Sequence, residues 1–370
     1  MAEARTTGAY ALVTGGGTGG HVYPALAVAE ELVRHGHPTE AIRFVGGRRG
    51  IESVAVPAAG FALDRLPGRG WRRRLTVEAA RDNVAALAGA ARALLAARRI
   101  VRRTRPRVVF GVGGYASLPC VLAARLARVP IVVHEQNAAP GLANRLAVRL
   151  GARAAVSLPG TPLAGAVLTG NPVRQAITSA HRRPDPDRPL VLVVGGSLGA
   201  WRLNEAALGL YDRWRDRRDV VVVHVTGRRD YPECLRRLAA ARRGDDQLDY
   251  TLVEYEEHIE RRYEQATVAL TRAGAVTVAE LAVVGLPAVL VPLPGAPGDH
   301  QTRNAAAVAT AGGAVVVPDA DATADRLGVE LDPLLRDAGR LDAMSRAART
   351  LGHPDAAARV AALVEATARA

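Results

Sequence analysis

The sequence predicts two α/β domains, each a doubly wound parallel sheet of Rossmann-like topology, facing a cleft. Short apolar runs rich in β-branched residues alternate with longer Ala- and Leu-rich stretches of helical spacing. The runs are apolar throughout, which is typical of strands buried on both faces of a parallel sheet. The alternation stops at a segment rich in proline and charge, residues 179–189, and then starts again. A length of 370 residues agrees with about two domains.

In the first half, the apolar runs predict strands at residues 9–13, 42–45, 108–112 and 131–134, with helices at 24–34 and 118–126. Pro24 is expected to open its helix, because proline is favoured at the first helical position.

In the second half, strands are predicted at residues 190–194, 220–225, 250–253, 267–270 and 288–291, followed by a last helix from about residue 356. We place the first domain at residues 1–175 and the second at 176–354, and expect the helix at 355–370 to pack back on the first domain. Ligands of such folds bind at the carboxyl ends of the strands.

The composition is basic, with 49 Lys+Arg against 36 Asp+Glu and a net charge of +13. All 49 cations are arginine, so a Walker phosphate loop, which needs a lysine, is excluded. The charge indicates an anionic partner: nucleic acid, a phosphate-rich ligand or an anionic membrane surface. Aromatic residues make up only 4% of the chain, which argues against a surface that stacks single-stranded bases. No apolar window reaches the length of a spanning helix, and two distant cysteines indicate a reduced compartment.

Glycine-rich turns follow four of the predicted strands, at residues 14–20, 111–115, 195–200 and 272–275. Glycine lets the backbone approach a ligand, and the helix that follows offers unpaired N–H groups and a positive dipole. One such turn is usually a plain connection, but four at strand ends favour an anion-binding cleft.

His21 is the candidate general base, because it lies on the first glycine turn and an imidazole can accept a proton from a hydroxyl near neutral pH. The alternative is a histidine that caps the following helix. Residues 134–137 (HEQN) directly follow a strand, where polar groups are costly unless they bond something. Three interpretations stay open. These residues bind a ligand, they hold other ligand-binding residues in place, or His134 and Glu135 form a structural pair.

Glu280 and Thr277 share one helix face, and a carboxylate there can accept two hydrogen bonds from a ribose diol. The alternative for Glu280 is an ordinary exposed glutamate. Asn171 and Pro172 are expected to start a helix, from which Arg174 either reaches a phosphate or is solvated.

Metal is not indicated. Asp185 and Asp187, and Asp319 and Asp321, match the Asp-x-Asp pattern of metal-dependent sugar transferases, but we interpret both pairs as solvated acids. Helix dipoles, N–H groups and arginine would then meet a ligand's phosphate charge, with no metal or cofactor.

A basic stretch begins with Trp71, Arg72, Arg73 and Arg74 and continues into a helix that ends in further arginines. An apolar stripe with arginine at both ends can lie in a membrane interface, with Trp71 at headgroup depth. The alternative is a helix packed on the sheet with solvated arginines, and the two can coexist.

Seven motifs together resemble, in order, the MurG family of peptidoglycan glycosyltransferases, which have the two-domain GT-B fold. They are residues 16–21 (GGTGGH), 113–115 (GGY), 134–137 (HEQN), 170–174 (GNPVR), 195–197 (GGS), 272–275 (RAGA) with Glu280, and 299–301 (DHQ) with Asn304 and Ala305.

The resemblance implies transfer of N-acetylglucosamine from its UDP donor, with inversion, to the C4 hydroxyl of undecaprenyl-diphosphate-linked N-acetylmuramoyl-pentapeptide. It also implies a peripheral location at the cytoplasmic face of the cell membrane, with an anionic membrane surface as partner and no nucleic acid. The matching positions are His21 as base; Thr18, Gly19 and Gly20 at the donor–acceptor junction; Asn137 at the sugar; Arg174 and Ser197 at the nucleotide and diphosphate; Ala275, Val276, Thr277, Val278, Ala279 and Glu280 at the diphosphate and ribose; Gln301 at the sugar hydroxyls; and Glu256 at uracil through its backbone.

One departure is visible, because Leu198 stands where many members have glutamine. Two other functions stay open at this point. One is a transferase or epimerase of the same fold with a soluble substrate, and the other is a basic nucleic-acid-binding protein, supported only by the charge.

Overall fold

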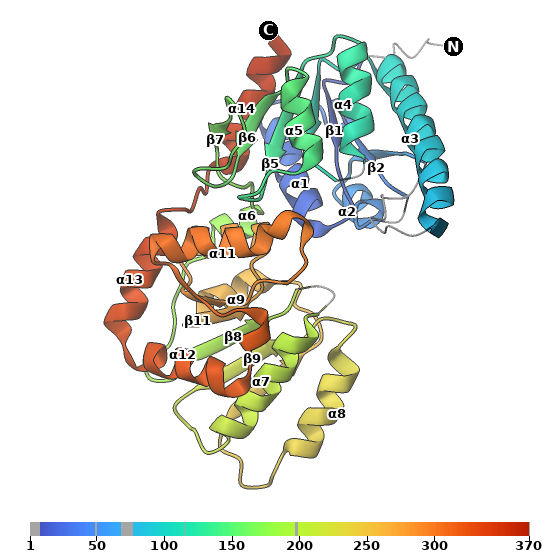
Figure 1. Ribbon diagram of the computed structural model, residues 1–370. Helices are drawn as coiled ribbons and strands as arrows, with labels where there is room; N and C mark the ends of the chain where they lie inside the picture. Colours follow the sequence, from blue (N-terminus) through green and yellow to red (C-terminus); the bar gives the residue numbers. More distant parts are fainter. Residues whose placement is uncertain (1–7, 49, 68–76, 115, 197–198, 370) are drawn as a thin grey trace, which may run out of the picture. The chain divides into compact units, whose positions relative to one another are not determined.

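The computed structural model describes residues 8–48, 50–67, 77–114, 116–196 and 199–369, with the backbone alone for residues 77–88 (Figure 1). The chain forms two compact units. The first unit comprises Met1–Arg174 and Pro354–Ala370, and the second comprises Gln175–His353.

The first unit contains a seven-stranded, all-parallel sheet in the order β3-β2-β1-β4-β5-β6-β7. Its strands are β1 (Ala11–Thr14), β2 (Ile42–Gly46), β3 (Ala62–Arg65), β4 (Val108–Gly111), β5 (Ile131–Glu135), β6 (Arg153–Val156) and β7 (Val167–Leu168). Its helices are α1 (Gly19–Arg34), α2 (Glu52–Ala58), α3 (Val77–Thr104), α4 (Ser117–Leu126), α5 (Leu142–Arg149) and α14 (Ala356–Arg369).

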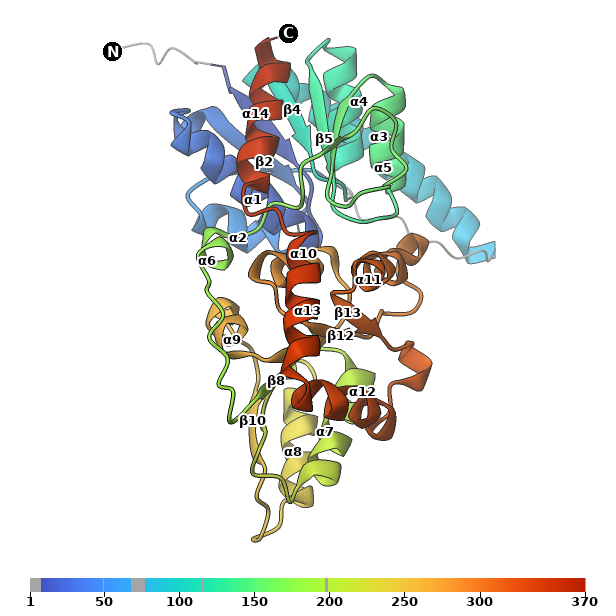
Figure 2. The ribbon, with the colours of Figure 1, turned by 90° about the vertical axis from the view of Figure 1, so that its left-hand side faces the viewer.

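Successive residues of β1 enter two different cores. Ala11 and Val13 pack with α1 and α14, whereas Leu12 packs with α3 and α4 on the opposite face of the sheet. Both faces are therefore covered, which explains why this strand is apolar throughout. The C-terminal helix α14 lies against α1, although the second unit separates the two in sequence (Figure 2).

The second unit contains a six-stranded, all-parallel sheet in the order β10-β9-β8-β11-β12-β13. Its strands are β8 (Leu190–Val194), β9 (Val221–Val225), β10 (Asp249–Val253), β11 (Val268–Thr271), β12 (Ala288–Leu290) and β13 (Ala314–Val316). Its helices are α6 (Gln175–Thr178), α7 (Trp201–Trp214), α8 (Tyr231–Ala241), α9 (Ile259–Gln265), α10 (Ala275–Val284), α11 (His300–Ala311), α12 (Ala324–Arg336) and α13 (Ala338–Arg349). The predicted class, two doubly wound parallel α/β domains, is confirmed.

Two predicted helix starts are wrong. Helix α1 begins at Gly19, after the N-cap Thr18, and Pro24 lies inside it. Pro24 is the sixth residue of α1, beyond the N–H groups that lack a helical partner, so its missing N–H costs one helical hydrogen bond. Asn171 and Pro172 do not start a helix, because the next helix, α6, begins at Gln175.

The proline- and charge-rich segment at residues 179–189 is attached to the rest of the second unit by a half-buried arginine. The guanidinium of Arg182 donates to the carbonyl oxygens of Gly285, Ala266 and Thr267 at 2.9, 3.3 and 3.2 Å. Burial, reinforced by the charge of Arg349, lowers the pKa of Arg182 to about 10. The sequence gives no sign of this anchor.

Candidate functional site

The four glycine turns follow the strands at the centre of each sheet, as predicted. In the first unit, turns follow β1 and β4, which are neighbours, and in the second, turns follow β8 and β11, which are also neighbours. The strand order reverses between each of these pairs, so each pair marks the topological switch point where ligands of open α/β sheets bind.

In the first unit, the two turns touch through their backbones. Gly114 has φ +81°, and a Cβ atom there would lie 2.4 Å from the carbonyl oxygen of Gly16. Only glycine satisfies both the backbone conformation and this approach. The contact fixes the two turns relative to each other.

His21 lies in the first turn of α1 and faces the second glycine turn. Its Nδ1 is 3.2 Å from the hydroxyl of Thr18, and its ring lies 3.3 Å from where a Cβ of Gly113 would be. The backbone N–H of His21 donates to the carbonyl oxygen of Thr18 at 3.1 Å. Thr18 is the N-cap of α1, and His21 contacts its hydroxyl from the third helical position. Gly19 and Gly20 form the same turn, so these four predicted residues lie together.

His134, at the end of β5, is a buried structural residue. Its Nε2 donates to the carbonyl oxygen of Gly170 at 3.0 Å, and its Nδ1 accepts from the amide of Gln136 at 3.1 Å. Burial lowers the pKa of His134 to about 4, so the ring is neutral at pH 7. It joins β5 to the segment that leads to Arg174.

Glu135 organises the loop after β5. Its buried carboxylate accepts hydrogen bonds from the backbone amides of Asn137 and Gly141, at 3.1 and 2.9 Å, and from the side chain of Asn144 at 2.8 Å. Residues 134–136 are therefore bonded to one another and to the neighbouring loops. Asn137 is half-buried, and its side chain also donates to Glu135, at 3.3 Å.

Arg174 is half-buried at the end of the first unit. Its guanidinium carbon lies 5.7 Å from the centre of the Tyr23 ring on α1. This cation–π contact places Arg174 beside the helix that carries His21. A fully solvated arginine, one of the two alternatives, does not fit this contact.

In the second unit, the predicted segment from Ala275 to Glu280 forms the first turns of α10, after the N-cap Gly274. Glu280 is only 6% exposed and accepts a hydrogen bond from the Tyr263 hydroxyl at 3.1 Å. The alternative of an exposed glutamate is therefore wrong. A buried carboxylate one and a half turns behind a helix N-terminus suits a ligand that carries phosphate at one end and a diol at the other.

In the turn that contains Gly199, the backbone packs closely against residues 226–230. A Cβ at Gly199, which has φ +83°, would lie 2.7 Å from the carbonyl oxygen of Thr226 and 2.4 Å from the carboxylate of Asp230. Ser197 and Leu198 lie outside the described residues.

A buried network lies behind this turn. His224 joins the Tyr250 hydroxyl, 2.7 Å from Nδ1, to the side-chain oxygen of Asn204, 3.0 Å from Nε2. Asn204 in turn donates to Asp230 at 3.1 Å. Burial lowers the pKa of His224 to about 3 and keeps the ring neutral.

Gln301 and Glu256 both bond to protein groups. The Gln301 side-chain oxygen accepts from the backbone amide of Leu293 at 2.9 Å, which fixes the loop at residues 293–299. The Glu256 carboxylate accepts from Arg262 at 2.7 Å and from the His258 amide at 3.1 Å. Burial alone would raise the pKa of Glu256, but these two partners hold it below the ordinary value.

One acid that was predicted to be solvated is half-buried and paired. Asp319 lies 2.5 Å from Arg272, which is 9% exposed and follows β11. The interpretation of Asp319 as a solvated acid is therefore wrong. The sequence could not reveal the pair, because Arg272 and Asp319 are 47 positions apart. Among the residues described, no group of three or more His, Cys, Asp or Glu side chains is arranged to hold a metal ion.

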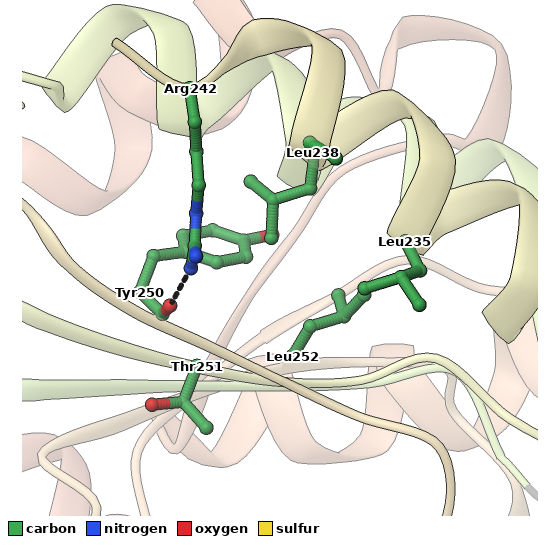
Figure 3. Close-up of a pocket in the computed structure, with 7 residues that line it drawn as sticks. Leu235, Leu238, Arg242, Tyr250, Thr251 and Leu252 are labelled. Carbon is green, nitrogen blue, oxygen red and sulfur yellow. Dashed lines mark hydrogen bonds between the residues drawn. The ribbon is translucent and has the colours of Figure 1, made fainter. Parts of the chain in front are cut away.

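An apolar cavity of about 330 Å³ lies between α8 and β10, away from the glycine turns (Figure 3). Leu235 and Leu238 on α8 face Leu252 and Tyr250 on β10, and Arg242 donates to the carbonyl oxygen of Tyr250 at 3.2 Å. None of the predicted site residues lines it.

The basic stretch is described in part. Trp71, Arg72, Arg73 and Arg74 lie outside the described residues. In the last turn of α3, Arg103 pairs with Asp64 at 2.6 Å. Within the described ranges, no helix is both long and apolar enough to cross a membrane.

Two doubly wound parallel sheets with glycine turns at both switch points define a two-domain α/β protein that binds ligands at those points. Comparison with known proteins agrees. Residues 11–156 match the glycosyltransferase family 28 N-terminal domain, and residues 190–360 match the glycosyltransferase family 28 C-terminal domain. The chain belongs to glycosyltransferase family 28.

Similar proteins cover almost the whole chain. A UDP-N-acetylglucosamine–N-acetylmuramyl-(pentapeptide) pyrophosphoryl-undecaprenol N-acetylglucosamine transferase of Alkalilimnicola ehrlichii is 45% identical, over 95% of this chain and 96% of that protein. The same-named protein of Methylococcus capsulatus is 42% identical, with the same coverage. The crystal structure of Acinetobacter baumannii MurG has a TM-score of 0.78 and 30% identity, covering 97% of this chain and 99% of the other.

Proposed function

We propose that this protein is an inverting hexosyltransferase of peptidoglycan synthesis. It moves N-acetylglucosamine from UDP-N-acetylglucosamine to the C4 hydroxyl of undecaprenyl-diphosphate-linked N-acetylmuramoyl-pentapeptide, converting lipid I to lipid II. The observation that carries the proposal is the match, at 45% identity and nearly full length, to a protein that bears the name of this activity.

The second unit binds the donor nucleotide in this proposal. The N-terminus of α10, from Ala275 to Ala279, meets the diphosphate with backbone N–H groups and the helix dipole. Glu280 accepts hydrogen bonds from the ribose hydroxyls, Gln301 holds the sugar, and the backbone at Glu256 meets uracil. Support comes from the burial of Glu280 and its fixed orientation by Tyr263.

The first unit supplies the chemistry. The C4 hydroxyl oxygen attacks the anomeric carbon from the side opposite the diphosphate, and His21 takes the hydroxyl proton as that bond forms. Thr18, Gly19, Gly20 and Asn137 line the reacting sugars. The leaving UDP gains negative charge, which Arg174, Ser197 and the α10 amides stabilise. The hydrogen bond between Thr18 and His21 supports this role, because it orients the imidazole.

The reaction proceeds without a metal or other cofactor in this proposal, because N–H groups and arginine meet the diphosphate charge. The test is an assay of the purified protein with UDP-N-acetylglucosamine and a short-chain lipid I analogue, with and without EDTA. We expect transfer in both. Absence of transfer would refute the function, and loss of transfer with EDTA alone would refute metal independence.

We further propose that the protein works as a peripheral protein on the cytoplasmic face of the membrane. The arginines at the end of α3 support an anionic lipid surface as partner, at about 1 kcal/mol for each arginine near the bilayer. Co-sedimentation should be stronger with vesicles containing anionic lipid than with purely zwitterionic vesicles. Equal binding to both would argue against this surface, and activity that is independent of the lipid tail would favour a soluble acceptor.

A further inference from the structure

Glu52 is a buried carboxylate that the proposed reaction does not use. It is the first residue of α2, follows the loop after β2, and is only 3% exposed. Burying a carboxylate is costly unless hydrogen bonds compensate it, so its partners indicate what it does.

Both carboxylate oxygens of Glu52 accept hydrogen bonds from glycine amides. Oε2 accepts from the backbone N–H of Gly17 at 2.9 Å, and Oε1 accepts from that of Gly47 at 2.8 Å. Gly17 belongs to the turn after β1, and Gly47 to the loop after β2. One side chain therefore ties two neighbouring loops together at the carboxyl edge of the sheet.

Three further glycines form the space that the carboxylate fills. A Cβ atom would lie 2.4 Å from a Glu52 carboxylate oxygen at Gly16, 2.6 Å from its Cγ at Gly46, and 1.9 Å from a carboxylate oxygen at Gly50. A side chain at any of the three positions would therefore displace Glu52 from its present place. Part of the glycine content of both loops is thus explained by Glu52, whatever ligand approaches from outside.

The path from Glu52 to the reacting groups is short. Gly17, which it holds, directly precedes Thr18, the N-cap of α1, and Thr18 contacts His21 through both its backbone carbonyl and its hydroxyl. We propose that Glu52 is a positioning residue whose carboxylate fixes the loop carrying Thr18 and His21. The effect on catalysis, but not the fixing of the loop, rests on the proposed function.

The main test replaces Glu52 by glutamine, which keeps the size but puts an NH2 group against an N–H donor. We expect kcat to fall about 10- to 100-fold, because small displacements of catalytic groups are that costly, with the KM for UDP-N-acetylglucosamine within about twofold. The matched control is E31Q, the same change at a buried carboxylate of α1 that pairs with Arg34 and His35. Equal kcat values for E52Q and E31Q would overturn the inference.

A second variant guards against misfolding of E52Q. Gly50→Ala keeps the Glu52 side chain but pushes a methyl group against its carboxylate. This variant should therefore lower kcat, as E52Q does. Gly89→Ala, where a Cβ meets no atom within 4 Å, is its control. Wild-type turnover in G50A would contradict the proposed role.

Amide hydrogen exchange separates this inference from the proposed function. Either the peptide covering residues 14–20 or the one covering Gly47 should exchange at least about tenfold faster in E52Q than in E31Q, because glutamine keeps one acceptor oxygen for the two amides of Gly17 and Gly47. This holds even if the wild-type protein fails to transfer N-acetylglucosamine, which would refute only the function. Unchanged exchange in both peptides would overturn the positioning role itself.

Discussion

The two units repeat one plan, with a parallel sheet, a switch point between its central strands, and a glycine turn after each of those strands. They differ in how the first of the two turns is held. In the first unit, the Glu52 carboxylate bonds Gly17, whereas in the second, Gly199 packs on the carbonyl oxygen of Thr226. Substitution of the one charged side chain should therefore loosen the first loop. The second loop should loosen only when its own glycine is replaced.

Each unit also buries one neutral histidine behind its site. His134 links β5 to Gly170 in the first unit, and His224 links Tyr250 to Asn204 in the second. The two units differ more in the groups that they offer to a ligand. The first unit presents the imidazole of His21, and the second presents a helix N-terminus with the buried Glu280. In the proposed function, the first unit transfers the proton and the second binds the nucleotide, and substitutions in each unit test this division.

The largest effect is expected in the first unit. His21→Ala should lower kcat by about 10²–10⁴, the range for loss of a general base, and leave UDP affinity unchanged. Steady-state kinetics and calorimetric titration with UDP measure the two. His181→Ala, at an exposed histidine of the second unit, is the control. Turnover of H21A at the wild-type level would remove His21 from the reaction.

The second unit should show the opposite pattern. Glu280→Gln should weaken UDP binding about 10- to 100-fold, the value of hydrogen bonds to a charged group, with a smaller change in kcat at saturating donor. Titrations with UDP and 2′-deoxy-UDP, with Glu233→Gln as a surface control, measure this effect. The variant should discriminate less between the two nucleotides. Unaltered UDP affinity would refute the ribose role.

A smaller effect is expected from a glycine contact. Gly114→Ala should destabilise the protein by about 1–3 kcal/mol, because it adds a contact with the Gly16 carbonyl to the strain of a positive φ. Gly160→Ala is the control, since Gly160 has φ +74° and open space around it. Urea unfolding measures both. Equal losses would mean that backbone strain alone matters and that the two turns do not depend on each other.

The smallest effect concerns pH. The pKa of His224 falls from 6.5 to about 3 on folding, so the unfolded chain binds more protons between these values. Its contribution to stability is therefore complete above pH 6.5 and is lost as the pH falls toward 3. His224→Gln should make the melting temperature less dependent on pH, by about 2–4 °C per unit between pH 6 and 4. His181→Gln should leave the slope unchanged, and an unchanged slope in H224Q would show that His224 is not buried in its neutral form.

Most central strands could be predicted, because strands buried on both faces are continuous apolar runs, such as residues 190–194. The edge strands β3 and β7 gave no such run, and β13 was missed although residues 314–317 are continuously apolar. Exposed residues occupy parts of β3 and both positions of β7, so their sequences resemble loops. The start of α1 was missed because glycine is a poor helix former and Pro24 suggested a later beginning.

The sequence by itself determined the order of strands and glycine turns along the chain, since apolar runs and glycine act locally. The two switch points depend on the order of the strands across each sheet, which only the tertiary structure decided. The sequence also singled out His21 and Glu280 as residue types suited to a base and a diol acceptor. Only the tertiary structure decided which carboxylates are buried and against what. Glu52 meets Gly17, 35 positions away, and Glu280 meets Tyr263 from another helix. Such contacts depend on how distant segments pack, which no local pattern of residues encodes.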